Sequence, residues 1–375
     1  MKHTADVVVI GAGIQGLSAA YHLAKIGIPN VMVVEQEFIG AGSSGRSASM
    51  LMLQVGPAWR IAFSKYCFER YMAFEEEFGS SPDYHRIGTL SLATDSVSGQ
   101  ERAAAVLRQQ AGIHTEIWTP DEIRQRYPAI YTDDLAFGVF GPEDGRIEAH
   151  SIMMGYKDGA QRLGAEIDQG VRATGIVKVS GRVAAVQTTE GEIATRCVVN
   201  AAGATAAQIG RWVGINLPID NRVRNIYVTD AFPLIPDETP FVDDIAAAWY
   251  YRKEGPGVLM GMGKRTGVDA PMHIDWAYLQ EVIEVAIHRV PALAEAGIAS
   301  GWAGIRPLTP DDRPILGPVD DVDGYVNSCG WGGYGIMHSP IGGQLIAEYV
   351  HDGRTSTFDI EPFLLARFDK DMGDS

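Results

Sequence analysis

The sequence is poor in cysteine and has fewer basic than acidic side chains, and each shortage excludes a class of protein. Its three cysteines, Cys67, Cys197 and Cys329, stand far apart and include no CxxC pair. Neither a disulfide framework nor a thiolate metal site is expected, and a reducing, cytoplasmic location is predicted. The 31 basic and 47 acidic side chains give a formal net charge of −16, which argues against nucleic acid and anionic membrane surfaces as partners.

Long apolar runs and paired histidines are also missing. No run of about 18 apolar residues occurs, so no membrane span is expected. The apolar run at 7–10 is too short for the core of a signal peptide. The nine histidines form no HxxH or HxxxH pair, so no metal is expected. A length of 375 residues with 46% hydrophobic side chains indicates an ordinary globular protein of about two domains.

The stretch "DVVVIGAGIQGLSAAYHLAKIG" predicts a nucleotide-binding turn. Its apolar residues 7–10 are typical of a buried parallel strand, and a helical pattern follows as far as Gly27. Gly11 permits a tight turn, Gly13 lets the backbone approach a diphosphate, and Gly16 lets the helix pack closely on the strand. The helix N-terminus favours a bound diphosphate. The predicted cofactor contacts in this turn are Gly11, Ala12, Gly13, Ile14, Gln15 and Gly16.

A second strand, "NVMVVEQ", ends in an acidic residue. Glu35 stands 24 residues after Gly11, where a carboxylate can accept hydrogen bonds from ribose hydroxyls and disfavours a 2′-phosphate. Strand, turn, helix, strand and acid together predict a dinucleotide site, with Glu35 and Gln36 as contacts. FAD and NAD both remain open at this point.

The loop "GAGSSGRSASMLML", residues 40–53, favours FAD. A flavin and its diphosphate lie over a glycine- and serine-rich loop of this kind, whereas a nicotinamide dehydrogenase does not need one here. The alternative is a flexible surface loop, but the apolar run at 50–53 leads directly into a buried segment. The predicted contacts are Gly42, Ser43, Ser44, Arg46, Ser47, Ala48 and Met50.

Two further segments rich in small residues are expected to belong to the same cofactor-binding domain. "RCVVNAAGA" reads as a buried strand at 197–200 whose small carboxyl-terminal residues let a cofactor lie against the backbone. "CGWGGYGIMHSP" reads as a glycine-rich turn that leads into a helix, with Ser339 as N-cap and Pro340 as the first helical residue. The alternative for this segment is a plain turn before a helix. The predicted contacts are Ala202, Gly203, Gly332, Gly333, Tyr334, Gly335, Ile336 and Met337.

Five motifs together resemble the D-amino-acid oxidase superfamily: "VVVIGAGIQGLSAAYHLA", "GSSGRSA", "VVNAAGA", "WAGIRPLTPDDRPILGP" and "CGWGGYGIM". Within it, the sequence is most similar to the group of glycine oxidase, sarcosine oxidase β-subunit and dye-linked proline dehydrogenase. The resemblance implies an α/β fold, α+β overall, with a discontinuous Rossmann-like FAD-binding domain of the GR2 type and an antiparallel-sheet substrate domain. The expected FAD domain comprises 1–84, 141–214 and 301–375, and the substrate domain 85–140 and 215–300. The resemblance adds Ala173 and Gly304 to the expected cofactor contacts.

Arg306 and Tyr250 are the predicted catalytic residues. An arginine between Ile305 and Pro307 is costly to bury without a partner, and a bidentate contact with a substrate carboxylate would offset that cost. The matching family arginine binds the α-carboxylate of the amino acid, and Arg306 is also expected beside the cofactor. The alternative is a structural pair with Asp311 or Asp312. Tyr250, in "AAAWYYRKEGPGVLMGMG", resembles the glycine oxidase tyrosine that hydrogen-bonds substrate.

The resemblance implies oxidation of a small carboxylated amine, such as an N-alkylglycine, glycine or a proline-like compound. Hydride would pass from Cα–H to flavin N5 and leave an imine that water hydrolyses, with no dedicated acid or base. The electron acceptor would be O₂, a quinone or a protein partner. Two alternatives stay open: a 2-hydroxy-acid or glycerol-phosphate dehydrogenase on the same fold, and the catalytic β-like subunit of a hetero-oligomeric amine dehydrogenase. A homo- or hetero-oligomer is compatible with the sequence.

The sequence departs from monomeric sarcosine oxidases at three places. The cysteine that holds their flavin corresponds to Gly304, so non-covalent FAD is expected. Their carboxylate-binding lysine corresponds to Met337, which shifts that role to Arg306. Their oxygen-activating lysine falls near Leu259, with Lys264 close by, which favours a dehydrogenase as an alternative.

Two histidines have open roles in this comparison. His150 matches a histidine that sarcosine oxidase β-subunits tie to a second flavin, although a surface or helix-capping role is preferred here. His338 is expected near the flavin.

Overall fold

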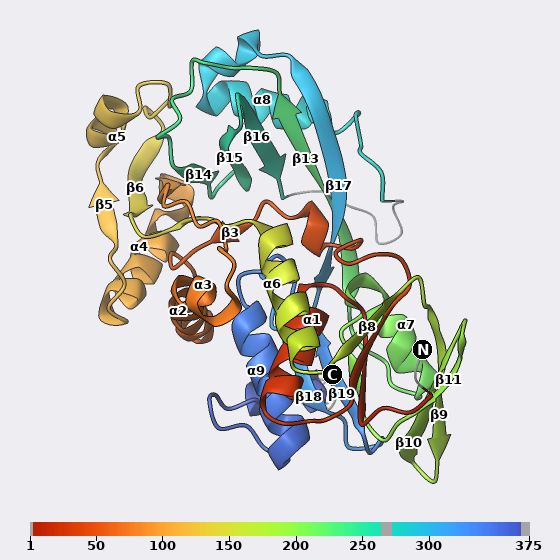
Figure 1. Cartoon of the computed structure of the whole chain (residues 1–375). Helices are drawn as coiled ribbons and strands as arrows, with labels where there is room; N and C mark the ends of the chain where they lie inside the picture. Colours follow the sequence, from red (N-terminus) through yellow and green to blue (C-terminus); the bar gives the residue numbers. More distant parts are fainter. Residues whose placement is uncertain (1–2, 264–271, 369–375) are drawn as a thin grey trace, which may run out of the picture.

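The computed structural model describes residues 3–263 and 272–368, in which two large sheets dominate (Figure 1). The smaller has six strands in the order β18-β19-β12-β1-β2-β8. All its pairs are parallel except β18–β19. Its strands are β1 (Val7–Ile10), β2 (Val31–Glu35), β8 (Glu166–Gln169), β12 (Val198–Asn200), β18 (Ile315–Pro318) and β19 (Tyr325–Cys329).

The predicted strand–turn–helix–strand unit is present in this sheet. All four residues of β1 are buried, as a central parallel strand requires. α1 (Ile14–Lys25) follows and ends before Gly27, whose φ of 106° suits the residue after a helix. Helices α2 (Ala58–Met72), α3 (Phe74–Phe78), α6 (Ala149–Arg162) and α9 (Ser339–Asp352) share one apolar core with α1. α7 (Ala206–Trp212) and a three-stranded sheet, β9 (Ala173–Val179), β10 (Arg182–Thr188) and β11 (Gly191–Ala194), share the core of the opposite face.

The first and the last α-helix of the described residues, α1 and α9, pack against each other. The Ser18 hydroxyl, on α1, donates to the Ser339 carbonyl at 2.6 Å. Gly343, on α9, allows this approach, because a Cβ there would lie 2.3 Å from Ser18 Oγ. The contact holds the first and last helices of the nucleotide domain side by side.

The second sheet has eight strands in the order β17-β13-β16-β15-β14-β4-β6-β5. β4 and β14 are parallel, and the other pairs are antiparallel. α8 (Leu279–Arg289) shares a core with one face, and α4 (Asp95–Gln110) packs on β4 and β6. The strands are β4 (Thr89–Thr94), β5 (Glu116–Trp118), β6 (Leu135–Gly141), β13 (Asp220–Thr229), β14 (Phe241–Asp244), β15 (Trp249–Glu254), β16 (Gly257–Met262) and β17 (Ile298–Leu308).

The mixed α/β architecture with a second, largely antiparallel sheet confirms the predicted fold class. β17 straddles the expected domain boundary at residue 301, because its whole length pairs with β13 in the second sheet. The exact division into domains therefore stays a prediction. The remaining short elements are α5 (Pro120–Arg126), β3 (Met50–Leu51), β7 (Gly145–Arg146) and the 3₁₀ turns Ser44–Arg46, Gly203–Thr205, Pro291–Glu295, Glu361–Phe363 and Leu365–Phe368.

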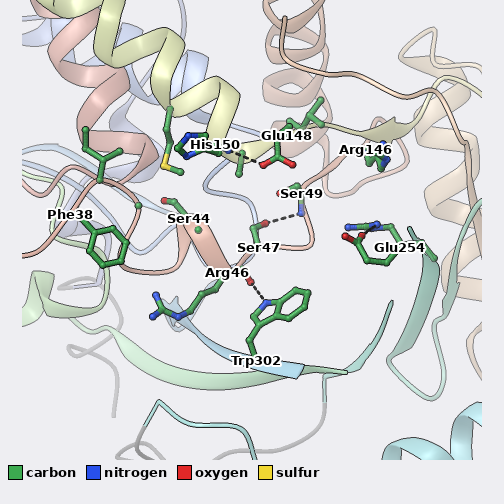
Figure 2. A pocket seen from close by; sticks show the side chains of 17 residues that line it. Phe38, Ser44, Arg46, Ser47, Ser49, Arg146, Glu148, His150, Glu254 and Trp302 are labelled. Carbon is green, nitrogen blue, oxygen red and sulfur yellow. Dashed lines mark hydrogen bonds and ion pairs between the residues drawn. The ribbon is translucent and has the colours of Figure 1, made fainter. Parts of the chain in front are cut away.

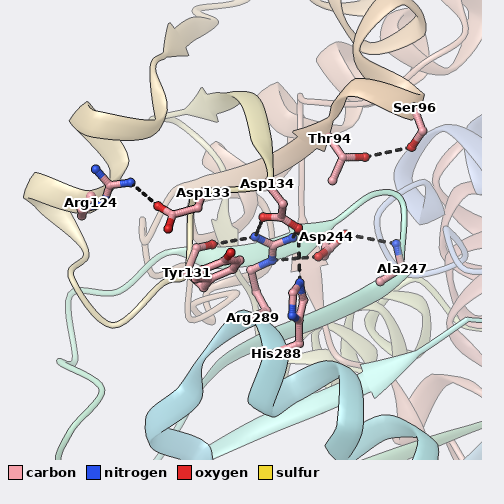
Figure 3. A network of polar contacts seen from close by, with 10 residues as sticks. All are labelled: Thr94, Ser96, Arg124, Tyr131, Asp133, Asp134, Asp244, Ala247, His288 and Arg289. Carbon is pink, nitrogen blue, oxygen red and sulfur yellow. Dashed lines mark hydrogen bonds and ion pairs between the residues drawn. The ribbon is translucent and has the colours of Figure 1, made fainter.

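A buried arginine fixes the position of β14. Arg289, at the end of α8, is 1% exposed; its Nε donates to Asp244 Oδ2 at 2.9 Å, and its Nη1 donates to Asp134 Oδ1 at 2.8 Å (Figure 3). Nη1 also donates to the Tyr131 carbonyl at 2.6 Å. A buried guanidinium is tolerated only with such pairing. The network ties α8 to β14 and to the chain that enters β6.

Across residues 3–263 and 272–368, no helix combines the length and apolar character needed to cross a membrane. The same residues contain no group of three or more His, Cys, Asp or Glu side chains suited to a metal ion. Lys264 lies outside the described residues.

Candidate active site

Three segments rich in small residues meet at one edge of the six-stranded sheet. β1, β12 and β19 are adjacent and parallel, so the segments that leave their carboxyl ends, 11–16, 201–203 and 330–335, lie next to one another. A hydrogen bond from Gln15 Nε2 to the Gly335 carbonyl, at 2.7 Å, joins the first and the last of them. This edge is where open α/β sheets bind ligands.

The packing of the first turn fits a bound diphosphate. A Cβ at Gly11, where φ is 105°, would lie 2.7 Å from the Ala201 carbonyl oxygen, and a Cβ at Gly16 would lie 1.9 Å from the Gly11 carbonyl oxygen. Both glycines are therefore required by the turn itself. Gly13 is different, because a Cβ there meets only Ser44 Oγ within 4 Å, at 3.3 Å. Its backbone stays open for the approach of a ligand, as predicted for the diphosphate of FAD.

Glu35 lies beside this turn, at the end of β2. Its Oε2 accepts a hydrogen bond from the Ala12 backbone N–H at 2.8 Å, and its Oε1 accepts one from the Glu37 N–H at 2.9 Å. A carboxylate has further lone pairs for ribose hydroxyls. Gln36 is exposed, and Ala173 is buried at the start of β9. Their roles as cofactor contacts stay predictions.

The loop at 42–50 is braced by the side chains expected to contact the flavin. Ser43 Oγ donates to the Ile305 carbonyl at 2.5 Å, and Arg46 Nη1 donates to the Gly42 carbonyl at 3.0 Å. Ser47 Oγ accepts from the Ser49 N–H at 2.9 Å. Ser44 differs, because its Oγ accepts from the Ile14 N–H at 3.0 Å, at the N-terminus of α1. The structure thus gives all four of these side chains partners within the protein, and contacts from them to a flavin remain a prediction.

The loop also lies against the eight-stranded sheet. Trp302 Nε1 donates to the Arg46 carbonyl at 3.1 Å, and Arg252 Nη2 donates to the Ala48 carbonyl at 3.2 Å. A Cβ at Gly304 would lie 3.2 Å from Arg46 Cβ. The expected cofactor loop is therefore clamped between the two sheets.

The eight-stranded sheet turns a polar face toward this loop. On β15, Trp249 and Tyr251 are fully buried in the core shared with α8, as expected for packing residues. Alternation places Tyr250 and Arg252 on the other face. A Cβ at Gly261, directly opposite Tyr250 on β16, would lie 2.4 Å from the Tyr250 hydroxyl. The tyrosine ring therefore lies over β16.

The strand register places Arg306 on the same face as Tyr250. Gly261 pairs with Ile226 on β13, and Ile226 pairs with Trp302 on β17. Directly opposite residues share a face, and so do residues two apart on one strand. Arg306, four residues beyond Trp302, therefore shares the face of Tyr250. The structure brings the two predicted catalytic residues to one surface.

The structure excludes the predicted alternative partners of Arg306. Asp311 Oδ2 pairs with Arg367 Nε at 2.8 Å, and Asp312 Oδ2 pairs with Arg60 Nη2 at 2.7 Å. Among the described residues the Arg306 side chain makes no ion pair or hydrogen bond. A Cβ at Gly333 would lie 3.1 Å from Arg306 Cζ. The guanidinium therefore lies against the C-terminal glycine segment.

Burial and charge shift the acidity of this surface. Burial raises the pKa of Tyr250, and the positive charge of Arg306 partly opposes that rise. Burial, with the charges of Asp244 and Glu101, raises the pKa of Asp243 to about 7, again opposed by Arg306. Asp243 was not singled out from the sequence, although it precedes the hairpin that carries Tyr250. Only the pairing of β14 with β15 shows that it lies directly opposite Tyr250.

His338 packs against the aromatic side chains of the C-terminal glycine segment, Trp331 and Tyr334. It is 1% exposed, its Nε2 lies 2.9 Å from Ser64 Oγ, and its ring stacks on Tyr334 at 5.7 Å. Burial and the charge of Arg60 lower its pKa to about 3, so the imidazole is neutral. His338, and not Ser339, is the N-cap of α9; the prediction of Ser339 is wrong by one residue. Ile336 and Met337 are buried in the first core.

A cavity of about 470 Å³ lies between the loop at 38–49, which includes predicted cofactor contacts, and the start of α6 (Figure 2). His150, the residue that matches the flavin-linked histidine of sarcosine oxidase β-subunits, borders this cavity and is exposed. Its backbone N–H donates to the side chain of Glu148, the N-cap of α6, at 3.0 Å. Other polar side chains in its lining are Ser44, Arg46, Ser47, Ser49, Arg146, Arg252 and Glu254.

These features fit an FAD-dependent oxidoreductase, with a nucleotide-binding sheet and a second, largely antiparallel sheet beside it. The chain matches the family DAO, FAD dependent oxidoreductase, over residues 6–349. It therefore belongs to this family, whose members bind FAD, and the predicted resemblance is confirmed.

Relatives and solved structures agree with this assignment. Mitochondrial sarcosine dehydrogenase of Mus musculus is 30% identical over 394 residues, which is 100% of this chain but 42% of that protein. Sarcosine oxidase subunit beta of Rhizobium meliloti is 27% identical over 97% of this chain and 88% of that protein. The crystal structure of L-proline dehydrogenase from P. horikoshii superposes with a TM-score of 0.91 and 26% identity, covering 99% of each chain. The chain thus spans less than half the length of the sarcosine dehydrogenase that it matches.

Proposed function

We propose that this FAD-dependent enzyme oxidises a small carboxylated amine, either an amino acid or a secondary amine such as an N-alkylglycine or a proline-like compound. The observation that carries the proposal is Arg306, a partly buried guanidinium without an ion pair among the described residues. It shares a sheet face with Tyr250. An arginine fork suits a carboxylate geometrically and in charge. Relatives named for sarcosine and proline oxidation support this substrate class.

The chain's own residues would bind and orient the substrate. Arg306 holds the carboxylate in a bidentate contact, which fixes the direction of the Cα–H bond. The raised pKa of Tyr250 keeps its hydroxyl protonated, so it can donate a hydrogen bond to the substrate. When bound, FAD supplies the acceptor for the hydride that leaves Cα. Catalysis then depends on positioning in a partly dry site.

The cofactor would be held without a covalent bond. The turn at 11–16, the loop at 42–50 and the glycine segment at 330–335 supply its backbone contacts, and Glu35 accepts from its ribose. Gly304 stands where monomeric sarcosine oxidases are expected to carry the cysteine that attaches the flavin. Space for a side chain here is limited, because a Cβ at Gly304 would lie 3.2 Å from Arg46 Cβ.

The electron acceptor is proposed to be O₂, a quinone or a protein partner. Similarity to a sarcosine oxidase subunit favours a hetero-oligomer in which this chain is the amine-oxidising part. A cytoplasmic location is proposed because Cys67, Cys197 and Cys329 are all free thiols.

Anaerobic reduction of the bound flavin tests the proposal. Purified holoprotein is mixed with N-methylglycine, glycine, proline and the matching 2-hydroxy acids, and the loss of yellow absorbance is followed. Bleaching by at least one amine and by no hydroxy acid supports the proposal. Bleaching by hydroxy acids alone supports the alternative dehydrogenase and contradicts it.

A further inference from the structure

Asp243 lies on the same sheet face as the two predicted catalytic residues. It is directly opposite Tyr250 on β15 and directly opposite Ser91 on β4. Its neighbour Asp244 points to the other face, where Arg289 holds it (Figure 3). Alternation along β14 therefore directs Asp243 toward the surface that carries Tyr250 and Arg306.

Asp243 is partly buried, and its carboxylate lacks the partners that the more deeply buried carboxylates of this region have. Glu101 Oε1 pairs with Arg108 Nη1 at 2.6 Å, and Asp144 Oδ1 accepts from the Leu53 N–H at 2.7 Å. Among the described residues the Asp243 side chain makes no hydrogen bond or ion pair. Removing a charged group from water without pairing is costly. A cationic ligand at this surface would offset that cost.

We propose that Asp243 binds the cationic amino group of the substrate, at the opposite end of a binding surface whose carboxylate anchor is Arg306. The inference rests on the proposed function and narrows its substrate class to amino acids and N-alkyl amino acids whose nitrogen is protonated in water. N-acyl amino acids and 2-hydroxy acids, which lack that charge, would leave Asp243 without a partner.

The charges around Asp243 determine how this contact depends on pH. Asp244 on its own strand and Glu101 on α4 raise its pKa, burial being the larger cause, and Arg306 on β17 opposes them. The Tyr250 hydroxyl faces it from β15 and stays protonated, because its pKa is raised. With a pKa of about 7, the carboxyl carries a charge at pH 8.5 and is mostly neutral at pH 6. Attraction of a cation is therefore present at the higher pH and lost at the lower.

A pair of ligands of equal shape tests this contact by binding alone. Trimethylglycine carries a quaternary nitrogen where 3,3-dimethylbutanoate carries a carbon, and both have the same carboxylate. Their dissociation constants are measured by calorimetry on holoprotein at pH 8.5 and pH 6. The proteins are wild type, Asp243→Asn and Asp237→Asn; Asp237 is a surface aspartate whose side chain is 92% exposed.

Wild type and Asp237→Asn are expected to prefer trimethylglycine on the order of tenfold at pH 8.5 and to lose that preference at pH 6. Asp243→Asn is expected to show no preference at either pH, with unchanged or tighter binding of 3,3-dimethylbutanoate. Equal binding of the two ligands by wild type at pH 8.5, or a preference that survives in Asp243→Asn, would overturn the proposal. The wild-type pH comparison decides the matter alone if the variant does not fold.

The same data separate this inference from the proposed function. If wild type is bleached by amines but shows no preference between the two ligands, only the role of Asp243 fails. If neither ligand binds and no amine bleaches the flavin, the carboxylate anchor at Arg306 fails, and the role of Asp243 fails with it.

Discussion

Gly333 leaves the space that the guanidinium of Arg306 occupies. A Cβ at residue 333 would lie 3.1 Å from Arg306 Cζ and 3.3 Å from both Nε and Nη1. The last glycine segment of the chain therefore shapes the surface on which the proposed substrate anchor stands. This contact links the C-terminal part of the nucleotide domain directly to the eight-stranded sheet.

Substitution of Gly333 by alanine should displace the anchor without removing it. The added methyl group forces the guanidinium to shift by a few tenths of an ångström, which weakens bidentate geometry. We expect Gly333→Ala to raise KM for a carboxylated amine several-fold, with normal flavin content. Steady-state kinetics checks this against Gly99→Ala, because a Cβ at Gly99 meets nothing within 4 Å. An unchanged KM in Gly333→Ala would show that the contact does not position Arg306.

Gly13→Val tests the diphosphate turn. Valine at this position would project toward Ser44 and cover the open backbone, so the variant should purify without yellow colour. Flavin absorbance per protein measures the loss, and circular dichroism shows whether the fold is kept. A folded variant with a full complement of FAD would remove Gly13 from the cofactor site.

Much of this nucleotide unit could be predicted because its signals are local. A strand, a glycine turn and a helix follow one another within the stretch from 6 to 27. The hairpin that carries Tyr250 is also predicted locally, from an alternating strand pattern and the turn that follows it. Individual side-chain partners distant in sequence could not be predicted. Asp311 and Asp312 were considered as partners of Arg306, but Arg367 and Arg60 hold them. Asp243 was missed for the same reason, since its place beside Tyr250 depends on strand register.

Arg289→Met should destabilise the second sheet. The substitution leaves Asp244, which is 2% exposed, without its cation. Breaking a buried pair in this way costs about 3–5 kcal/mol. Urea unfolding of the apoprotein, with Arg124→Met as a surface control, measures the difference. Arg124 is half-exposed and pairs with Asp121 and Asp133. A loss equal to that of the control would show that the Arg289 network contributes little.

Two buried histidines should contribute stability that mild acid removes. Burial lowers the pKa of His22 to about 4 and that of His338 to about 3. The unfolded chain therefore binds more protons than the folded one below about pH 6.5. The stability that these two histidines contribute is present in full above that pH and falls as the pH drops toward 4, by up to about 1.4 kcal/mol per pH unit for each histidine. The raised pKa values of Asp243 and Asp144, both about 7, act in the opposite direction over the same range. Urea unfolding of wild type and His338→Asn at pH 7 and pH 5 checks this: from pH 7 to pH 5 the free energy of unfolding of the variant should fall less, or rise more, than that of wild type. An equal slope in the variant would contradict a neutral His338.

The proposed role of Arg306 is tested most directly by the anaerobic rate of flavin reduction at increasing concentrations of N-methylglycine. The rate is measured in wild type, Arg306→Lys and Arg306→Ala. Loss of the carboxylate contact should weaken the binding free energy of the substrate in Arg306→Ala by on the order of 2–4 kcal/mol. The apparent dissociation constant should rise accordingly. Arg306→Lys should recover part of the lost binding, because lysine keeps the positive charge but lacks the bidentate geometry of the guanidinium. FAD content should be the same in all three proteins. Saturation of Arg306→Ala at the wild-type concentration would contradict the central claim that this guanidinium anchors the substrate.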